Sequence, residues 1–139
     1  VSSLEAKAVM VLQELYLDTH VLVWLYDQGA QGFTSQTLGH LESAEKLLIS
    51  PMVTLEIEFL FEIEKITQPS SIIVHYLSEN LGLSVCAKPF PRVAVQAMDI
   101  KWTRDPFDRL ITAQAGLDRS PLLTKDRIIH DNYQHAIWS

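Results

Sequence analysis

Short runs of apolar residues alternate along this chain with longer segments in which apolar residues recur every three or four positions. The short runs are typical of buried strands, and the longer periodic segments are typical of amphipathic helices. The runs predict strands at Glu14–Asp18, Leu47–Ile49, Leu83–Ala87, Leu122–Thr124 and Ala136–Trp138. Strands that alternate with helices indicate an α/β fold, in which a mostly parallel sheet is covered by helices on both faces.

The segments between these strands carry helix start and stop signals. We predict helices over residues 19–27, 35–46, 51–66, 70–81, 92–99 and 106–115, a loop over 29–33, and a helical turn from Asp126. Ser50 followed by Pro51 is a typical helix start, and Gly82 is a typical helix end. Asp105 before Pro106 indicates another N-cap, and Asp108 then lies in the first turn, where the helix dipole favours an acid.

Composition places the chain among globular proteins, with 47% hydrophobic and 20% charged residues in a length of 139 that fits one domain. No apolar run approaches the roughly 18 residues that a membrane span needs. The first residues lack the pattern of a signal peptide, so we expect a cytoplasmic protein that does not enter the membrane. We expect residues 1–139 to form a single domain, with 1–13 as a possible N-terminal extension or short helix. Cys86 is the only cysteine, which excludes a disulfide within the chain, and we expect it to be buried.

The net charge of −6 is distributed unevenly along the chain. Residues 1–100 carry twelve acidic side chains against five basic ones, whereas residues 101–139 carry five against six. A module that binds nucleic acid is usually basic, so the total charge argues against a simple phosphate-binding module. Arg104, Arg109, Lys125 and Arg127 nevertheless cluster beside aspartates, where they are either solvated surface charges or phosphate contacts.

Glu56 is the acidic residue whose place in its helix is hardest to explain as ordinary surface chemistry. Its helical neighbours are all apolar: Met52, Val53, Phe59, Leu60 and Ile63. An acid in a buried stripe is costly unless it is paired or bound to a cation, so Glu56 has either an arginine partner or a metal. We expect the other acids of this helix, Glu58, Glu62 and Glu64, to form a solvated face.

Four acids can converge at one edge of the predicted sheet: Asp18, Glu56, Asp108 and Asp126. Open α/β sheets bind ligands outside the carboxyl ends of their strands, and both Asp18 and Asp126 lie there. Taken singly, each aspartate also fits turn or capping chemistry. Together they form a set of oxygen donors that suits Mg²⁺ or Mn²⁺ and that would repel one another without a cation. Such a site suits the hydrolysis of a phosphodiester bond. The five histidines form no metal-ligand pattern, and we expect His20 to be a structural residue of its helix.

The stretches LYLDTHVLVWL, SPMVTLEI, RDPFDRLITAQA and LLTKD resemble, in order and spacing, the PIN-domain nucleases, especially the VapC-like toxin ribonucleases of toxin–antitoxin pairs. The resemblance extends from about Leu15 to Trp138 and implies a PIN-like three-layer α/β/α sandwich. It implies that Asp18, Glu56, Asp108 and Asp126 are the catalytic, metal-binding acids and that Asp105 is an accessory or capping residue. It further implies an Mg²⁺- or Mn²⁺-dependent ribonuclease with an RNA substrate, a small antitoxin partner and a homodimeric state. Arg104, Arg109 and Lys125 are then candidate contacts to RNA phosphates.

The chain departs from the family pattern at several places outside the four acids. Close relatives often have His where Thr103 stands and Trp where Leu55 stands, and they commonly carry a lysine and a glycine near Leu60 and Glu64. Two other functions remain open. One is a catalytically silent PIN-like module that acts by binding a partner protein. The other is a phosphoryl-transfer enzyme with a nucleophilic aspartate. Such enzymes normally carry a second acid two residues after the nucleophile, where this chain has His20.

Overall fold

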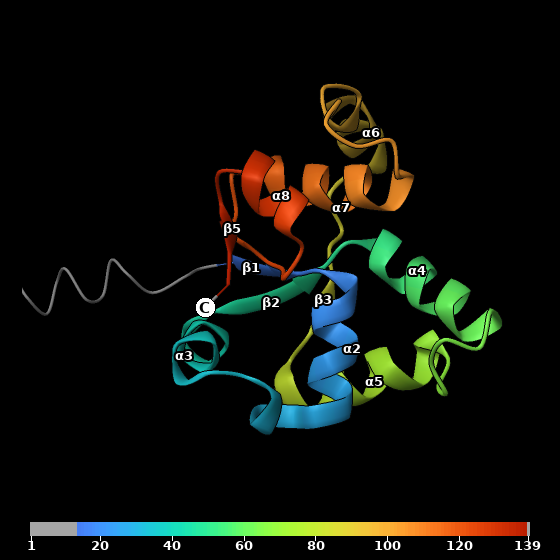
Figure 1. Ribbon diagram of the computed structural model, residues 1–139, viewed down its shortest axis with the longest axis vertical. Helices are drawn as coiled ribbons and strands as arrows, with labels where there is room; N and C mark the ends of the chain where they lie inside the picture. The colour runs from blue at the N-terminus through green and yellow to red at the C-terminus, as the bar shows by residue number, and fades with distance from the viewer. Residues whose placement is uncertain (1–13, 139) are drawn as a thin grey trace, which may run out of the picture.

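Five short strands pair side by side into one parallel sheet in the computed structural model, which describes residues 14–138 (Figure 1). The strands are β1 (Glu14–Leu17), β2 (Lys46–Ile49), β3 (Ser84–Val85), β4 (Leu122–Leu123) and β5 (Ala136–Ile137). Their order in the sheet is β3-β2-β1-β4-β5, so β1 occupies the centre. The predicted extension or helix at residues 1–13 lies outside the described part of the chain.

Helices cover both faces of this sheet. The segments on one side are α2 (Thr19–Gln28), the 3-10 turn η1 (Gly29–Gly32), α3 (Ser35–Ser43) and α5 (Ser70–Leu81), and those on the other are α6 (Phe90–Met98), α7 (Pro106–Gly116) and α8 (Arg127–Asn132) (Figure 1). Helix α4 (Pro51–Glu62) packs against α2, α5 and α7. The arrangement confirms the predicted three-layer α/β/α sandwich and its parallel sheet.

The main core lies between the sheet and the helices. Leu15, Tyr16 and Leu17 of β1 are all almost completely buried, because a central strand covered on both faces has no solvated side. The register places Leu15 opposite Leu47 of β2 and Leu17 opposite Leu123 of β4. A smaller cluster of buried residues joins α6 to α7. Within residues 14–138, no helix combines the length and apolarity that crossing a bilayer requires.

Some predicted boundaries are wrong by a few residues. The helix predicted over 35–46 ends at Ser43, because Lys46 pairs with Glu14 in the sheet. The helix predicted over 51–66 ends at Glu62, and Glu64 adopts a positive φ of 62°. The helix predicted over 92–99 begins earlier, at Phe90, with proline in its first turn. The predicted loop at 29–33 contains the turn η1, and pairing in β3, β4 and β5 covers only two residues each.

Other sequence signals are confirmed by the backbone and by burial. Gly82 ends α5 in the left-handed conformation, with a φ of 70°. Cys86 is buried, and its Sγ lies 3.1 Å from the hydroxyl oxygen of Tyr16.

The prediction of a solvated face on α4 is wrong for Glu58. Its carboxylate accepts a hydrogen bond of 3.0 Å from the backbone N–H of Ser70 at the start of α5. Pro69, which occupies the N-cap position there, has no side-chain group that can accept this bond. Glu58, which lies on α4, therefore caps the start of α5. Glu62 and Glu64 are exposed, as predicted.

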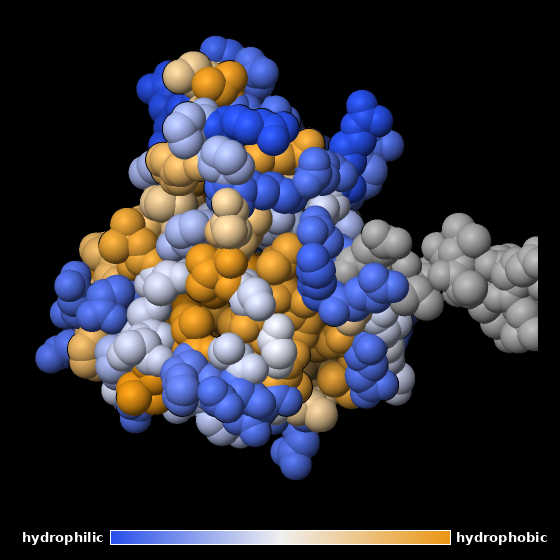
Figure 2. Space-filling model, turned by 180° about the vertical axis from the view of Figure 1, so that it is seen from behind, coloured by the Kyte–Doolittle hydropathy of each residue, from blue (hydrophilic) through white to orange (hydrophobic). Residues whose placement is uncertain are grey.

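Several large apolar side chains remain on the surface. Leu55 and Phe59 of α4 and Ile63, its C-cap, follow one another at four-residue steps and are each about half exposed. Val95 and Met98 of α6 are each 62% exposed. The rear view shows hydrophobic surface in the middle of the molecule and again at the top, where α6 lies (Figure 2). Patches of this kind on a folded domain are typical of surfaces that contact other macromolecules.

Candidate active site

Asp18 follows the last residue of β1 and starts α2. Its side chain is 6% exposed and accepts two hydrogen bonds, one of 2.8 Å from the Thr19 backbone N–H and one of 2.6 Å from the Thr124 hydroxyl. The first bond makes Asp18 the N-cap of α2. The second ties the end of β1 to the end of β4, so the buried carboxylate is held at the carboxyl edge of the sheet.

Glu56 reaches toward this edge from α4. Its partner is a hydroxyl and not the arginine that the sequence left open, because Thr19 Oγ1 donates a hydrogen bond of 2.5 Å to Glu56 Oε1. The predicted apolar stripe around Glu56 is only partly buried: Val53 is buried, but Phe59 and Ile63 are each 46% exposed. Glu56 is therefore half-buried because α4 packs against α2, which carries Thr19.

Asp105 and Asp108 occupy the start of α7 in different ways. Asp105 is exposed and accepts hydrogen bonds from the backbone N–H groups of Phe107, at 2.8 Å, and Asp108, at 3.4 Å, so it is the predicted N-cap. The Asp108 side chain is half-buried in the first turn of α7. Among residues 14–138, none donates a hydrogen bond to its carboxylate. Helix capping thus explains the position of Asp105. It does not explain Asp108, because no neighbouring group donates a hydrogen bond to the Asp108 carboxylate within residues 14–138.

Asp126 caps α8, the helix that follows β4. Its carboxylate accepts hydrogen bonds from the backbone N–H groups of Ile128, at 2.8 Å, and Ile129, at 3.1 Å. Its own backbone N–H donates to the Thr124 hydroxyl oxygen at 3.0 Å. Thr124 therefore contacts both Asp18 and Asp126, and its hydroxyl joins the two strand-end aspartates.

The four acids influence one another electrostatically. Burial raises the pKa of Asp18 above its usual range, the charge of Asp126 raises it further, and the Thr124 and Thr19 hydrogen bonds oppose both effects. Burial likewise raises the pKa of Glu56, and the charge of Asp18 adds to this.

Asp108 is affected both by burial and by the charges of the other three acids. Burial raises the pKa of Asp108 to about 7, and the charges of Asp105, Asp18, Asp126 and Glu56 all contribute in the same direction. Four carboxylates from four separate elements thus share one negative region at the carboxyl edge of the sheet.

The donors in this region fit a hard divalent cation in their chemistry. All are carboxylate oxygens, and the ion pairs found within residues 14–138 involve Lys88 with Glu14 and Asp118 rather than any of the four acids. A cation would relieve the repulsion that raises the pKa of Asp108. In the described part of the chain, however, no three His, Cys, Asp or Glu side chains are arranged closely enough to hold one ion. Binding an ion would therefore require movement of side chains or bridging water molecules.

The predicted phosphate contacts differ in their surroundings. Arg104 is exposed beside the start of α7. The Arg109 guanidinium donates to the backbone carbonyl oxygen of Ala97, near the end of α6, through Nε at 3.3 Å and Nη2 at 3.1 Å. The ammonium group of Lys125 lies over the ring of Trp24, 3.5 Å from its centre. Arg109 is thus engaged in joining α7 to α6, whereas Arg104 and Lys125 are exposed.

Sequence reasoning missed two residues that hydrogen-bond to the acids. Thr19 and Thr124 donate to Glu56 and Asp18, and the available signal was a hydroxyl residue within two positions of a strand-end aspartate. His20, which the sequence predicts to be a structural residue of its helix, lies in α2 and is exposed, and its charge lowers the pKa of both Asp18 and Glu56.

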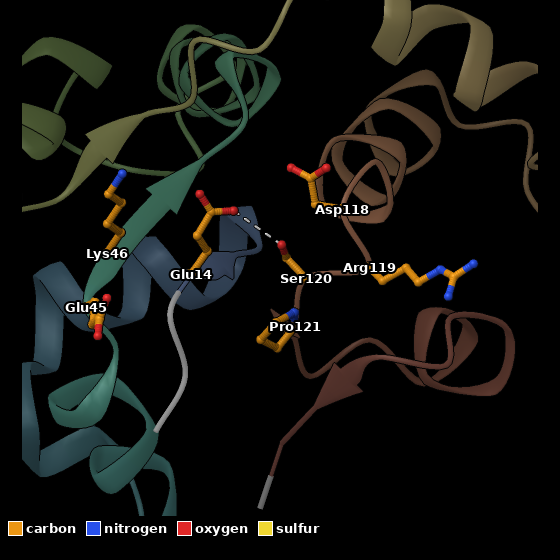
Figure 3. Close-up of a pocket in the computed structure, with 7 residues that line it drawn as sticks. All are labelled: Glu14, Glu45, Lys46, Asp118, Arg119, Ser120 and Pro121. Carbon is orange, nitrogen blue, oxygen red and sulfur yellow. Dashed lines mark hydrogen bonds between the residues drawn. The ribbon is translucent and has the colours of Figure 1, made fainter. Parts of the chain in front are cut away.

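A separate pocket of about 410 Å³ lies at the opposite edge of the sheet (Figure 3). Glu14 and Lys46, which begin β1 and β2, line it together with Asp118, Arg119 and Ser120. The Ser120 hydroxyl donates a 3.4 Å hydrogen bond to Glu14 (Figure 3). This pocket lies at the amino ends of the strands, whereas ligands of parallel α/β sheets bind at the carboxyl ends, so we do not take it as the active site.

Comparison with known proteins identifies the family. The model of the PIN domain family matches residues 15–134, which include all four acids and the helices that carry them. The chain belongs to the PIN domain family. The match confirms the resemblance to PIN domains that the four sequence stretches indicated.

Solved structures support the same fold. This PIN domain superposes on a chain from the crystal structure of VapBC2 from Rickettsia felis bound to a DNA fragment from their promoter, with a TM-score of 0.63. The match covers 91% of this chain and 100% of that chain at 14% sequence identity, so it is evidence about the fold. No curated protein matches the sequence.

Proposed function

We propose that this PIN domain is a divalent-metal-dependent endoribonuclease and the toxin of a toxin–antitoxin pair, acting on RNA in the cytoplasm. The observation that carries the proposal is the negative region formed by Asp18, Glu56, Asp108 and Asp126 at the carboxyl edge of the sheet. Membership of the PIN family and likeness to a chain of the VapBC2 structure support it.

In this proposal the four acids hold one or two Mg²⁺ or Mn²⁺ ions, directly or through water. When bound, such an ion supplies an activated water molecule and offsets negative charge at the phosphate that is cleaved. Thr124 and Thr19 orient Asp18 and Glu56, and their hydrogen bonds favour the ionised forms that bind a cation. Asp108, with a pKa of about 7, is ready to lose its proton at neutral pH when a cation approaches.

The RNA backbone would contact the basic side chains around this edge. Arg104 and Lys125 are exposed, and we propose them as contacts to phosphates. Arg109 already donates to the Ala97 carbonyl, so we propose that its positive charge acts on the RNA at longer range. Asp105 serves the site indirectly by starting α7, which carries Asp108.

A protein partner is the second part of the proposal. An open cluster of acids favours a basic side chain, so we propose an antitoxin that places an Arg or Lys against Asp18 and Asp108. The exposed apolar side chains of α4, and those of α6 at the top of Figure 2, provide surface for the antitoxin and for a homodimer. A complex in which the partner approaches neither aspartate would contradict this mode of inhibition.

Cleavage of RNA with and without metal tests the nuclease. The purified protein should cleave RNA in Mg²⁺ or Mn²⁺, lose this activity in excess EDTA and recover it when metal is restored. Asp18→Asn, purified in parallel, serves as the control for contaminating ribonucleases and should be inactive. Equal cleavage in excess chelator by the wild type, with an inactive control, would refute the metal mechanism.

A catalytically silent interaction module is the second candidate. The observation that favours it is that no three acids, within residues 14–138, are arranged closely enough to hold an ion. That module would bind no Mg²⁺ or Mn²⁺ at these acids and would cleave no RNA under any of the conditions above. Calorimetric titration with Mn²⁺ separates the two, because only the nuclease should bind the ion in a manner that Asp18→Asn abolishes.

A further inference from the structure

Three aromatic rings from distant parts of the chain meet beside the candidate active site. Trp24 lies on α2, Phe33 follows η1 and Trp138 follows β5. The ring centres are 5.7 Å apart for Trp24 and Phe33, 6.1 Å for Trp24 and Trp138, and 5.8 Å for Phe33 and Trp138. The planes of the two indole rings differ by only 29°, and all three side chains are half-buried. The two tryptophans therefore present neighbouring, similarly inclined rings that solvent partly reaches.

The ring of Trp24 is held in position by its surroundings. A Cβ atom at Gly32 would lie 2.5 Å from Trp24 Nε1, so the indole packs directly against the backbone of η1. Phe33 and Trp138 pack against the main core. Rings that are fixed before a ligand arrives bind it with little loss of conformational freedom.

Lys125 connects these rings to the acids. Its Nζ lies 3.5 Å from the centre of the Trp24 ring and 5.4 Å from that of Trp138. The residue stands between Thr124, which donates to Asp18, and Asp126, which caps α8. The segment that covers the rings is thus the same segment that supports the strand-end aspartates.

We propose that Trp24 and Trp138 form a stacking platform for one unpaired nucleobase of the RNA, next to the phosphate that is cleaved. This inference rests on the proposed function, because it assigns part of the same substrate to a further group of residues. In the free protein Lys125 lies on the platform. When RNA binds, the base takes the place of the ammonium group, which turns to an adjacent phosphate.

Energetics favour this exchange. A cation–π contact at an exposed lysine is weak, whereas stacking of a base on an aromatic side chain is stronger and independent of sequence. The ammonium also gains a charged partner in the phosphate. Single-stranded RNA is commonly recognised by aromatic rings combined with a basic side chain.

The charge of the whole chain favours a base as the occupant. With a net charge of −6, this protein gains little from general attraction to the phosphate backbone. A neutral stacking interaction adds affinity without needing a basic surface. A platform beside the acids therefore explains how an acidic protein can hold RNA near a negatively charged site.

Binding of matched oligonucleotides tests the platform. The probes are an RNA hexamer and an abasic hexamer with the same ribose–phosphate backbone, and anisotropy measures both dissociation constants in EDTA. The wild type should bind the base-bearing hexamer about 5- to 150-fold more tightly, the range expected for one stacked base. Trp24→Leu should remove most of this difference without changing the affinity for the abasic probe, and Trp24→Phe should keep most of it.

Two further variants complete the design. Trp138→Leu removes the second ring and supports the same conclusion if Trp24→Leu fails to fold. Tyr76→Leu removes a ring that is 51% exposed on α5 and contacts Tyr26 instead, and it should bind both probes as the wild type does. Thermal unfolding confirms that each variant is folded before its affinity is compared.

The outcomes separate this inference from the proposed function. Equal affinity of the wild type for both probes, or an equal loss for both in Trp24→Leu, would overturn the platform. If metal-dependent cleavage of RNA persists in that case, only the proposed stacking platform is refuted, and the proposed nuclease function is retained. If the protein neither binds nor cleaves RNA, the proposed function and the platform fall together.

Discussion

Asp108 should destabilise the metal-free protein at alkaline pH, so Asp108→Asn should stabilise it. The pKa of Asp108 is raised to about 7 in the folded protein, against about 3.9 in an unfolded chain. The folded state therefore holds this proton more tightly than the unfolded state does. As a result the free energy of unfolding falls as the pH rises from about 4 to about 7, and the whole loss is present above that range. Asparagine keeps the shape of the side chain and carries no charge at any pH.

The size of the effect follows from the same pKa difference. About three pKa units correspond to an upper limit of about 4 kcal/mol. The side chain is only half-buried, and screening by solvent reduces this to about 1–2 kcal/mol. The substitution also gives up a favourable interaction of about 0.3–1 kcal/mol with the start of α7. We expect a net gain of about 1 kcal/mol at pH 8, or roughly 4 °C in Tm. At pH 5 only about a third of the electrostatic part remains.

Thermal unfolding in EDTA at pH 5 and pH 8 measures this difference. The gain of Asp108→Asn should be present at pH 8 and should be much smaller at pH 5, where about a third of the electrostatic part remains. Adding Mg²⁺ at pH 8 should then stabilise the wild type, because an ion that binds only the folded state raises its stability, and should do little for the variant. The variant should also cleave almost no RNA. A variant that is less stable than the wild type at pH 8 and cleaves RNA normally would show that Asp108 serves only to start α7.

Two further substitutions separate structural from chemical roles. Asp105→Ala removes the N-cap of α7 and should cost about 0.5–2 kcal/mol in urea unfolding, with a much smaller loss of cleavage than Asp108→Asn. A loss of cleavage as complete as that of Asp108→Asn would place Asp105 in the chemistry. Thr124→Val removes the hydroxyl that donates to the buried Asp18 carboxylate and should cost about 1.5–3 kcal/mol at pH 8. The cost should shrink as the pH is lowered, because burial raises the pKa of Asp18 and the bond from Thr124 is weaker to a protonated carboxyl group. An unchanged free energy of unfolding at pH 8 would contradict the role of this bond.

Boundaries set by local backbone chemistry could be predicted from the sequence. The start of α7 at Pro106 and the end of α5 before Gly82 depend on a cap and on a left-handed glycine, both of which are visible in a few residues. The end of α4 could not be predicted in this way, because apolar spacing continues beyond Glu62 without a helix breaker. After the helix ends, the chain turns back, and the Ser70 backbone N–H donates to the carboxylate of Glu58, a contact between residues twelve positions apart.

The site shows the same division between local and tertiary information. Strand-end aspartates in a parallel sheet must lie at one edge, so the positions of Asp18 and Asp126 follow from topology alone. The partner of Glu56 could not be read from spacing, because it depends on how α4 packs against α2. The sequence predicts either an arginine or a metal beside Glu56, whereas in the structure the Thr19 hydroxyl donates a hydrogen bond to its carboxylate. The metal itself, the RNA and the antitoxin remain predictions.

The four acids divide into two pairs by what each contributes to folding. Asp18 and Asp126 cap helices, so losing either would weaken the domain as well as the proposed metal site. Glu56 and Asp108 cap no helix, and burial raises the pKa of both, as it does that of Asp18, so replacing Asp108 should make the domain more stable while removing a proposed metal ligand. Selection for a durable fold and selection for activity therefore act in opposite directions at Asp108. If the proposed cleavage were no longer needed, loss of this carboxylate would leave a well-folded protein.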